Sequence, residues 1–434
     1  MKFITSFYYT FGTKVISLFI LLLSRILTAR ILGPADLGSL GNALNFTTIV
    51  SRWGSMGIAP ATQFVSSKYP LQKNKVFFYA IFASVLLGMV NLIFLVYFKN
   101  EILNWQFQSD THAQWAYQKF IPFLPFIIVS MTLPILLLGS GQIKKYSFTQ
   151  ILPLLLQTVI LLIAYFQPLS LDLIILAQII YWLSTVLIAI FLIGFKNLTL
   201  KFDKGLLLIF VKYALKSWPQ VILQFGITRF AVLIGSQYLS SKNLGYYILA
   251  SNLSESFLVI NTSITPLIFN KISSQGSNIK FLGISLRLSI ISFLPVLFVT
   301  IAFGKPIFIF FFSSEFDQTW NLLLLLLLSI LFHSLARICI NYIAALGKNA
   351  IISVIQLAQL MVLFVVCTLS CPVFGVFGLC WASIAASLAG FVLCMISIQK
   401  YEKEYQGFFP LFKFTKNDMH IIFRALGLKI DHKK

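Results

Sequence analysis

Charged residues are scarce in this sequence, because Asp, Glu, Lys and Arg together make up only 10% of its 434 residues. Soluble domains carry roughly 25% charged residues. Hydrophobic residues make up 59% of the chain, and the mean hydropathy is +0.90. The composition therefore excludes an ordinary soluble protein and predicts a polytopic membrane protein.

Recognisable catalytic and metal-binding patterns are also missing. The sequence has no P-loop, no HExxH motif and no pair of carboxylates at a useful spacing, and its four histidines are isolated. The five cysteines lie in late apolar segments without a metal-type spacing, so we interpret them as packing residues. We therefore expect a protein that is not an enzyme and that holds no cofactor and no metal.

Apolar segments long enough to cross a bilayer, which takes about 20 residues per helix, are abundant. Twelve can be counted, at residues 14–32, 37–60, 76–98, 119–139, 149–167, 172–195, 219–238, 244–268, 282–303, 320–342, 350–371 and 374–398. The apolar stretch GKPIFIFFF before the tenth segment is either re-entrant or an extension of the ninth. The predicted fold class is an all-α polytopic membrane protein with about 12 transmembrane helices.

The basic residues alternate between the connections of these segments. Of the 33 Lys and Arg residues, 23 lie on one side of the predicted membrane and five on the other: Arg30, Lys99, Lys119, Lys242 and Lys305. Cytoplasmic loops are enriched in Lys and Arg, so the first side is predicted to be cytoplasmic and to hold both termini. This distribution accounts for the net charge of +21 without nucleic-acid binding.

The remaining five basic residues are arginines inside apolar segments. A guanidinium near the bilayer centre costs several kcal/mol, so such residues usually face a bundle interior or a water-filled cavity. For Arg287, near the inner end of its segment, we expect bonds to backbone carbonyls instead. The other four are predicted to form a column of positive charge that binds an anionic cargo: Arg25, Arg52, Arg229 and Arg337.

Glu255 is the only acidic residue well inside an apolar segment. It is expected either to pair with Arg229, which we favour, or to bind a coupling proton, since a desolvated carboxyl can titrate near neutrality. Asp36 lies at an outer turn, where we expect it to cap a helix. The longest outer connection, residues 99–118, offers only Glu101, Asp110 and His112 as titratable candidates besides lysine.

An internal repeat is visible at an offset of 207 residues. Leu32, Leu37, Gly38, Ala43 and Asn45 recur as Leu239, Leu244, Gly245, Ala250 and Asn252. Six crossings per half make this a parallel repeat of two six-helix lobes, which usually hold their cargo between them. We assign residues 1–203 to an N-terminal lobe, 204–398 to a C-terminal lobe and 399–434 to a basic cytoplasmic tail. The amphipathic segment GLLLIFVKYALKSW, which starts at Gly205, is expected to be a linker on the inner surface.

The segment from Ser24 to Gly38, SRILTARILGPADLG, resembles the opening of bacterial polysaccharide repeat-unit flippases of the Wzx type. These belong to the multidrug/oligosaccharidyl-lipid/polysaccharide exporter superfamily. The segment WGSMGIAPAT from Trp53 is similar to the family's second helix, and Leu244-Gly245-Tyr246 is similar to its repeated turn. The sequence departs from many relatives in lacking an Asp in the seventh helix near Arg229.

The resemblance implies a flippase that translocates undecaprenyl diphosphate-linked oligosaccharide from the cytoplasmic to the periplasmic leaflet by alternating access. Arg25 and Arg52 would contact the diphosphate, and Arg30 would guard the outer mouth. The alternatives are an ion-coupled multidrug antiporter of the same superfamily, a lipid II flippase, and a non-transporting polysaccharide polymerase or assembly protein. One intramembrane Glu against four arginines argues against a cation antiporter.

The same resemblance implies the surroundings of the protein. The expected location is the bacterial cytoplasmic (inner) membrane, in a pathway for O-antigen, capsule or a related polysaccharide. The expected partners are the undecaprenyl diphosphate-linked oligosaccharide and membrane lipids, together with polysaccharide polymerase and chain-length enzymes. No nucleic acid is expected among them.

Overall fold

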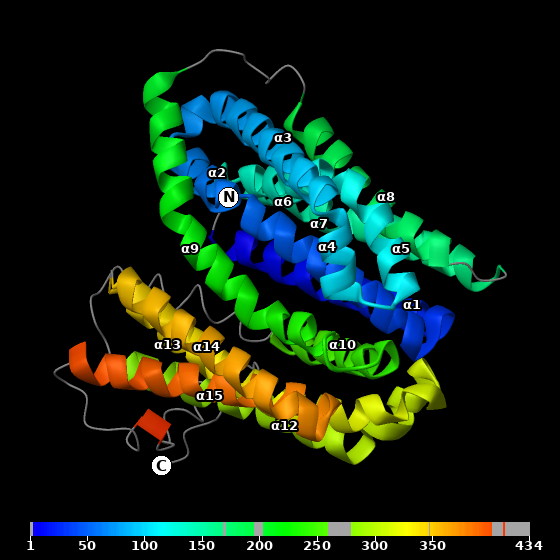
Figure 1. Ribbon diagram of the computed structural model, residues 1–434. Helices are drawn as coiled ribbons and strands as arrows, with labels where there is room; N and C mark the ends of the chain where they lie inside the picture. The colour runs from blue at the N-terminus through cyan, green and yellow to red at the C-terminus, as the bar shows by residue number, and fades with distance from the viewer. Residues whose placement is uncertain are drawn as a thin grey trace. The chain divides into compact units, whose positions relative to one another are not determined.

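The computed structural model describes residues 3–167, 171–194, 203–258, 279–346, 348–401 and 411–412. All regular structure in these residues is helical (Figure 1). The principal helices are α1 (Phe3–Gly54), α2 (Ile58–Lys68), α3 (Lys73–Tyr97), α4 (Lys99–Ile102), α5 (Thr111–Phe120), α6 (Leu124–Gly139), α7 (Ile143–Tyr165), α8 (Leu171–Ile193), α9 (Lys204–Gly235), α10 (Ser241–Ser256), α12 (Ile279–Phe312), α13 (Asp317–Ala345), α14 (Asn349–Phe374) and α15 (Val376–Tyr401). Short helical turns occupy Pro70–Gln72, Leu103–Phe107 (η2), Ile121–Phe123 and Ser314–Phe316.

Ten helical stretches among the described residues are long and apolar enough to cross a membrane. The predicted class, an all-α polytopic membrane protein, is confirmed. The predicted segment 14–32 and most of the segment 37–60 lie in α1, on either side of a break at Gly33, and the segment 244–268 extends into residues outside the described ranges. The count of twelve and the cytoplasmic termini stay predictions.

Helix α1 changes direction at Gly33, which has φ +66° and ψ 178°. Glycine adopts this left-handed φ without the steric cost that a side chain brings. Pro34 follows, and proline suits the first turn of a helix because its fixed φ is helical and its missing N–H would have no partner there. The Leu-Gly-Pro sequence therefore joins two helices by a sharp break with no loop between them.

The chain forms two compact units, the first of which comprises residues 1–249 and 311–316. One of its cores surrounds Phe46, Tyr117, Phe120 and Trp182, with the rings of Phe46 and Tyr117 edge to face at 5.5 Å. Helices α3 and α6 pack along each other, as do α7 and α8 (Figure 1). These contacts build the helical framework that surrounds the cavities described below.

Helix α9 differs from the expectation of a surface linker followed by a separate crossing. It runs unbroken from Lys204 to Gly235 and includes Pro219. Leu206, Phe210 and Ala214, on the amphipathic half, are buried in a second core of the first unit, formed mainly with α2, α3 and α6. One side of this segment is therefore buried against helices of the first unit, while Leu208 and Leu215 on its other side are exposed. The contact-defined boundary falls after Leu249, and the lobe boundary at residue 203 stays a prediction.

The start of α9 is held by Asp203. Its carboxylate accepts the backbone N–H of Leu206 at 3.1 Å, and Lys75 Nζ donates to it at 2.8 Å. The hydrogen bond from Lys75 lowers the pKa of the Asp203 carboxyl, and the backbone N–H of Leu206 adds to this effect. Asp203 is thus both the N-cap of α9 and its ionic tie to α3.

The second unit comprises residues 250–310 and 317–434. Its core is formed by α12, α13, α14 and α15 around Leu286, Tyr342 and Phe391. The GKPIFIFFF stretch lies inside α12, so it lengthens the ninth predicted segment, as one of the two expectations had it. All five cysteines are buried and free, as expected of packing residues.

The repeat-related segments meet in the first unit. A Cβ added at Gly38 would collide with the backbone carbonyl of Ser241, and one at Gly245 would collide with that of Pro34. Gly38 and Gly245 are equivalent at the 207-residue offset, and so are Pro34 and Ser241. Gly41 likewise faces its own equivalent, Ile248, whose Cδ1 would lie 2.6 Å from an added Cβ. The contacts are therefore symmetric, and a local two-fold axis passes through the crossing of α1 and α10.

Candidate functional site: an arginine-lined cavity in the first unit

A cavity of about 490 Å³ opens among α1, α2, α6, α7, α8 and α9. We call it the arginine pocket. Its polar lining consists mainly of amide, phenol and hydroxyl groups around a single guanidinium, from Arg52, Gln63, Tyr146, Gln150, Tyr181 and Gln224. No Asp or Glu belongs to the lining among the described residues. The cavity is therefore cationic.

The position of Arg52 follows from the local sequence Trp53-Gly-Ser-Met-Gly57. The chain leaves the helix after Gly54 and starts α2 at Ile58, with Met56 at φ 46° and Gly57 at φ 75°. The predicted segment 37–60 is thus broken, and Arg52 lies in the last turn of α1, where the helix dipole favours a cation. Trp218 Nε1 donates to the carbonyl of Trp53 at 2.7 Å, which fixes this break against α9.

The guanidinium of Arg52 has a mostly uncharged environment. Its Cζ lies 5.7 Å from the ring centroid of Phe225, and it interacts electrostatically with Tyr181 and with Arg229. Its buried Nε has no hydrogen-bond partner. The structure therefore brings two of the four predicted arginines, Arg52 and Arg229, near each other without a carboxylate in the cavity wall.

The other predicted residues lie elsewhere. Arg25 is half-buried in α1 of the first unit, whereas Arg337 and Glu255 belong to the second unit. On α13, Arg337 interacts electrostatically with His333, one turn earlier. The column of charge across both units and the pairing of Glu255 with Arg229 stay predictions.

Two arginines make contacts with backbone carbonyls. Arg287 donates through Nη1 to the carbonyl of Leu411 at 2.8 Å, so the structural role expected for it is confirmed. Arg30, which is exposed, donates through Nε to the carbonyl of Phe311 at 2.7 Å. Its role as a guard of the outer mouth stays a prediction.

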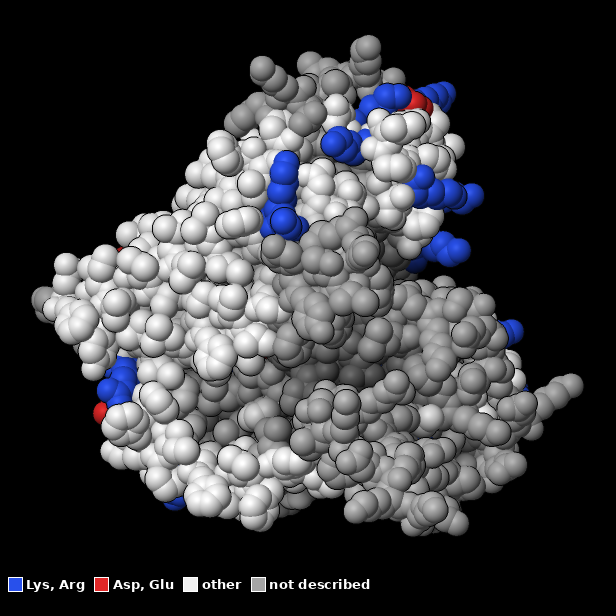
Figure 2. Space-filling view, turned by 180° about the vertical axis from the view of Figure 1, so that it is seen from behind, with Lys and Arg blue, Asp and Glu red and all other residues white. Residues whose placement is uncertain are grey.

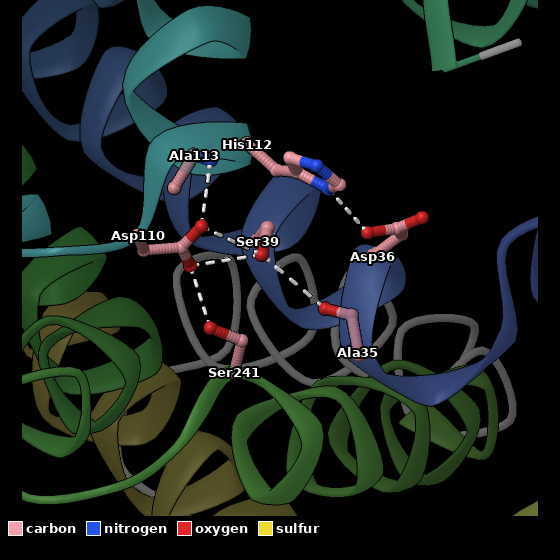
Figure 3. A network of polar contacts seen from close by, with 7 residues as sticks. All are labelled: Ala35, Asp36, Ser39, Asp110, His112, Ala113 and Ser241. Atoms are coloured by element: carbon pink, nitrogen blue, oxygen red, sulfur yellow. Dashed lines mark hydrogen bonds and ion pairs between the residues drawn. The ribbon is translucent and has the colours of Figure 1, made fainter.

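His112, which was interpreted as isolated in the sequence, contacts Asp36: its Nδ1 lies 2.6 Å from Asp36 Oδ1 at an exposed site. The helix capping expected of Asp36 stays a prediction. The cap in this region is Asp110, which accepts the backbone N–H of Ala113 at the start of α5 (Figure 3). Residues 99–118, expected as a loop, are largely helical, and this folding brings Asp110 and His112 to α1.

The surface of the protein separates charged and apolar regions. Figure 2 shows Lys and Arg side chains gathered near the top of the view, while most of the described surface in that view carries neither basic nor acidic residues. Many large apolar side chains are exposed, Phe94, Phe191 and Phe298 among them. Exposed apolar helices of this length are typical of contact with lipid tails.

Residues 27–321 match the family of polysaccharide biosynthesis proteins. The chain belongs to this family. A search of curated proteins finds no match.

Three solved structures resemble the whole chain of this polysaccharide biosynthesis protein. The lipid II flippase MurJ, in an inward closed conformation, is similar with a TM-score of 0.73 and 16% identity over 98% of this chain and 99% of that one. An inward-facing multidrug resistance MATE family transporter of the MOP superfamily has a TM-score of 0.72 and 13% identity, over 89% and 96%. A MOP superfamily transporter from Pyrococcus furiosus has a TM-score of 0.62 and 14% identity, over 92% and 96%. These similarities establish the two-lobed fold of a MOP transporter.

The family and the fold indicate in what kind of protein the arginine pocket lies. This polysaccharide biosynthesis protein is a multi-pass membrane protein with the architecture of flippases and transporters. No group of three or more His, Cys, Asp or Glu in its described part could hold a metal ion. What the arginine pocket can do chemically is bind an anion through Arg52 and hydrogen-bond a polar group through the surrounding amides.

Proposed function

We propose that this protein is a flippase that moves undecaprenyl diphosphate-linked oligosaccharide repeat units from the cytoplasmic to the periplasmic leaflet of a bacterial inner membrane. The observation that carries the proposal is the arginine pocket. It presents a guanidinium with an unpartnered Nε in a cavity wall that contains no carboxylate. The family of polysaccharide biosynthesis proteins and the lipid flippase fold support the same cargo class.

The chemistry of Arg52 fits a diphosphate. A guanidinium presents donors in a planar fork that can bind two phosphate oxygens at once, and such charge-assisted bonds are stronger than neutral ones. Arg52 and Arg229 repel each other across a medium of low dielectric constant. An anionic group beside Arg52 would be attracted to its guanidinium, so the free site favours an anion over a neutral or cationic cargo.

Three residues extend this site in the proposal. Arg25 and Arg337 act as further contacts of the cargo along its path, and Glu255 tunes the site by pairing with an arginine or by binding a coupling proton. The two lobes alternate between inward and outward access, while the prenyl tail stays in the lipid. Polysaccharide polymerase and chain-length enzymes would receive the repeat unit on the periplasmic side, for O-antigen, capsule or a related polymer.

A multidrug antiporter is the second candidate, because the chain is as similar in fold to a MATE family transporter as to a lipid flippase. Export of cationic drugs requires a negative site, however, and the described lining of the arginine pocket has Arg52 as its only charged group. A lipid II flippase would share the diphosphate chemistry and differ in the glycan. The experiment below separates these candidates.

The test uses a host strain that lacks this gene. Lipid-linked oligosaccharides are extracted, identified by mass, and assigned to a leaflet by their accessibility to a membrane-impermeant periodate reagent before and after the cells are opened. The proposal expects repeat-unit intermediates to accumulate in the cytoplasmic leaflet while the surface polysaccharide is lost. Intermediates that reach the periplasmic leaflet in the deletion strain would contradict the proposal, and accumulation of lipid II alone would reassign the cargo.

A further inference from the structure

A second cavity of the first unit, also of about 490 Å³, lies at the crossing of α1 and α10. We call it the Asp110 pocket. It is lined by the start of the second half of α1, by residues 106–112, and by the turn between α9 and α10. The proposed function assigns no role to it. Its composition differs sharply from that of the arginine pocket.

One wall of the Asp110 pocket is fixed by a network of hydrogen bonds (Figure 3). Ser39 Oγ donates to the Asp110 carboxylate, with 2.8 Å to Oδ2 and 3.0 Å to Oδ1. Ser241 Oγ donates to Oδ2 at 2.6 Å, and the backbone N–H of Ala113 donates to Oδ1 at 2.9 Å. The three donors come from α1, α10 and α5. These donors are neutral, so they add no positive charge beside the carboxylate. They hold the carboxylate in one position.

A second observation points to a ligand. The Gln106 side chain is fully buried, and its Nε2 donates to Asn42 Oδ1 at 2.9 Å and to Ser236 Oγ at 2.8 Å. Its Oε1, in contrast, has no hydrogen-bond partner. A buried acceptor without a donor is unfavourable, and most such groups in proteins are satisfied by protein, water or ligand. Gln106 belongs to the lining of the pocket and its amide is held by Nε2, so a ligand donor that reached Oε1 would satisfy this acceptor.

The charges of the pocket restrict the ligand. No Lys or Arg belongs to its described lining, and of its two carboxylates Asp36 contacts His112 whereas Asp110 meets only neutral donors, so an anionic ligand such as phosphate is disfavoured. The described part of the chain, this lining included, has no group of three or more His, Cys, Asp or Glu that could hold a metal ion. The size of the pocket is that of a small-molecule site, which spans roughly 300–1,000 Å³. An acceptor-rich wall of this kind matches a ligand that carries several hydroxyl donors.

We infer that the Asp110 pocket binds one neutral sugar unit, whose hydroxyl groups donate to Gln106 Oε1 and to the carboxylate wall. The sugar's own oxygens accept from the hydroxyl and amide donors of Ser240 and Gln108 at the mouth. Asn42 and Arg52 lie ten residues apart on α1, so the two pockets are separated by roughly 15 Å along one helix. A cargo with a diphosphate at one end and sugars at the other could span them. Assigning the bound sugar to the transported glycan rests on the proposed function, whereas sugar binding itself does not.

The test measures sugar binding directly. Full-length protein in phosphatidylcholine nanodiscs is mixed separately with D-glucose, D-galactose, N-acetyl-D-glucosamine and D-glucuronate at millimolar concentration, and saturation transfer to the sugar ring protons is recorded by NMR. We expect transfer to at least one neutral sugar, and less to glucuronate than to glucose because Asp36 and Asp110 repel its carboxylate. Gln106→Leu should weaken binding about fivefold, which is the loss typical of one neutral hydrogen bond.

Gln157→Leu is the matched control. Gln157 is also a glutamine; it is half-buried and its Nε2 donates to Gln178 Oε1 at 2.8 Å, but it lines neither pocket. This variant should keep the wild-type signal. If Gln106→Leu does not fold, Ser240→Cys replaces it, because Ser240 lines the pocket and is exposed whereas all five native cysteines are buried. Modification of that cysteine with a bulky methanethiosulfonate should abolish the transfer.

Any of three results would overturn the inference: no transfer to any of the neutral sugars, an affinity that Gln106→Leu leaves unchanged, or transfer that persists after blocking at position 240. Failure of the flippase proposal looks different. In that case the deletion strain carries its intermediates in the periplasmic leaflet, while the purified protein still binds sugar in a manner that depends on Gln106. Sugar binding should also survive Arg52→Ala, since Arg52 does not line this pocket.

Discussion

The arginine pocket and the Asp110 pocket belong to the same unit, share helix α1 and have equal volumes of about 490 Å³. Their charges are opposite. The first has Arg52 and no described carboxylate, and the second has Asp36, Asp110 and His112 and no described Lys or Arg. The comparison teaches that one helix can contribute to two cavities of different chemistry, and the two proposals above assign the anionic end of a cargo to the first and its hydroxyl groups to the second.

The largest effect is expected from removing the charge of the arginine pocket. Arg52→Ala should slow export of surface polysaccharide about thirtyfold, because a charge-assisted hydrogen bond contributes about 2 kcal/mol. Arg52→Lys should restore it only in part, since an ammonium cannot form the bidentate contact. The measurement is the rate at which polymer appears at the cell surface after induction of each variant at native expression level.

Lys305→Ala is the control for that series. It removes an exposed cation paired with Asp317 at 2.9 Å, and exposed pairs of this kind contribute little. Export should be unchanged in this variant. A wild-type export rate in Arg52→Ala would show that Arg52 does not bind the cargo. The two pockets could then no longer be compared as two ends of one binding site.

The next largest effect is expected at the helix crossing that forms one side of the Asp110 pocket. Gly38→Ala places a methyl group against the backbone carbonyl of Ser241, which cannot move like a flexible side chain. We expect a loss of about 1–3 kcal/mol of stability and a loss of sugar binding, because α1 and α10 must separate. Thermal unfolding in detergent and the sugar-binding signal measure these two effects.

Gly12→Ala provides the matched control on the same helix, since nothing lies within 4 Å of an added Cβ there. It should be neutral or slightly stabilising, because alanine favours helix over glycine. If Gly38→Ala kept the sugar signal of the wild type, the crossing would not shape the pocket.

Asp110→Asn should have a smaller effect. The amide keeps one acceptor oxygen, so part of the network with Ser39, Ser241 and Ala113 is lost, at a cost of about 1–2 kcal/mol. Charge is lost as well, so the pocket should discriminate less between glucose and glucuronate. Asp172→Asn, at an exposed site in the first turn of α8, controls for charge alone. Unaltered discrimination in Asp110→Asn would show that the carboxylate does not select the ligand.

The smallest effect is expected from the ion pair between Asp203 and Lys75, whose loss in acid limits the pH range in which the two pockets can be compared. Lys75 lowers the pKa of Asp203, so the ion pair stabilises the folded protein above the ordinary carboxyl pKa. That contribution is lost as the pH falls through the lowered pKa of the folded state. Asp203→Asn should therefore lower stability slightly at neutral pH, where the ion pair is present, and leave it unchanged in acid below the lowered pKa, so that the acid side of a plot of thermal stability against pH becomes flatter. An identical acid limb in both proteins would assign the acid sensitivity to other groups.

Much of the fold was predictable because bilayer-spanning helices follow from the length of apolar runs alone. The short repeat around Gly38 and Gly245 predicted equivalent segments, and the structure shows the two glycines at a symmetric crossing. Arg52 could be chosen as a candidate because an intramembrane guanidinium needs a polar or water-filled environment. The column of four arginines stays a prediction, and the sequence did not indicate that Gln63 and Gln224 would line a cavity with Arg52.

Other features could not be predicted from local sequence. The segment after Gly205 has an amphipathic pattern that is equally compatible with a membrane surface and with a protein core, and only packing against α2 and α3 decided between them. Asp110 looked like one polar residue of a loop. Its role depends on Ser39 and Ser241, which lie 71 and 131 residues away in sequence.

The sequence by itself determined the class of protein, the presence of intramembrane cations and the places where helices break, because hydropathy, charge and the backbone preferences of Gly and Pro are local properties. The tertiary structure decided which polar groups share a cavity. It alone placed Arg52 among neutral amides and Asp110 among hydroxyls, because the charge of a cavity is set by residues from several helices that have no fixed spacing in the chain.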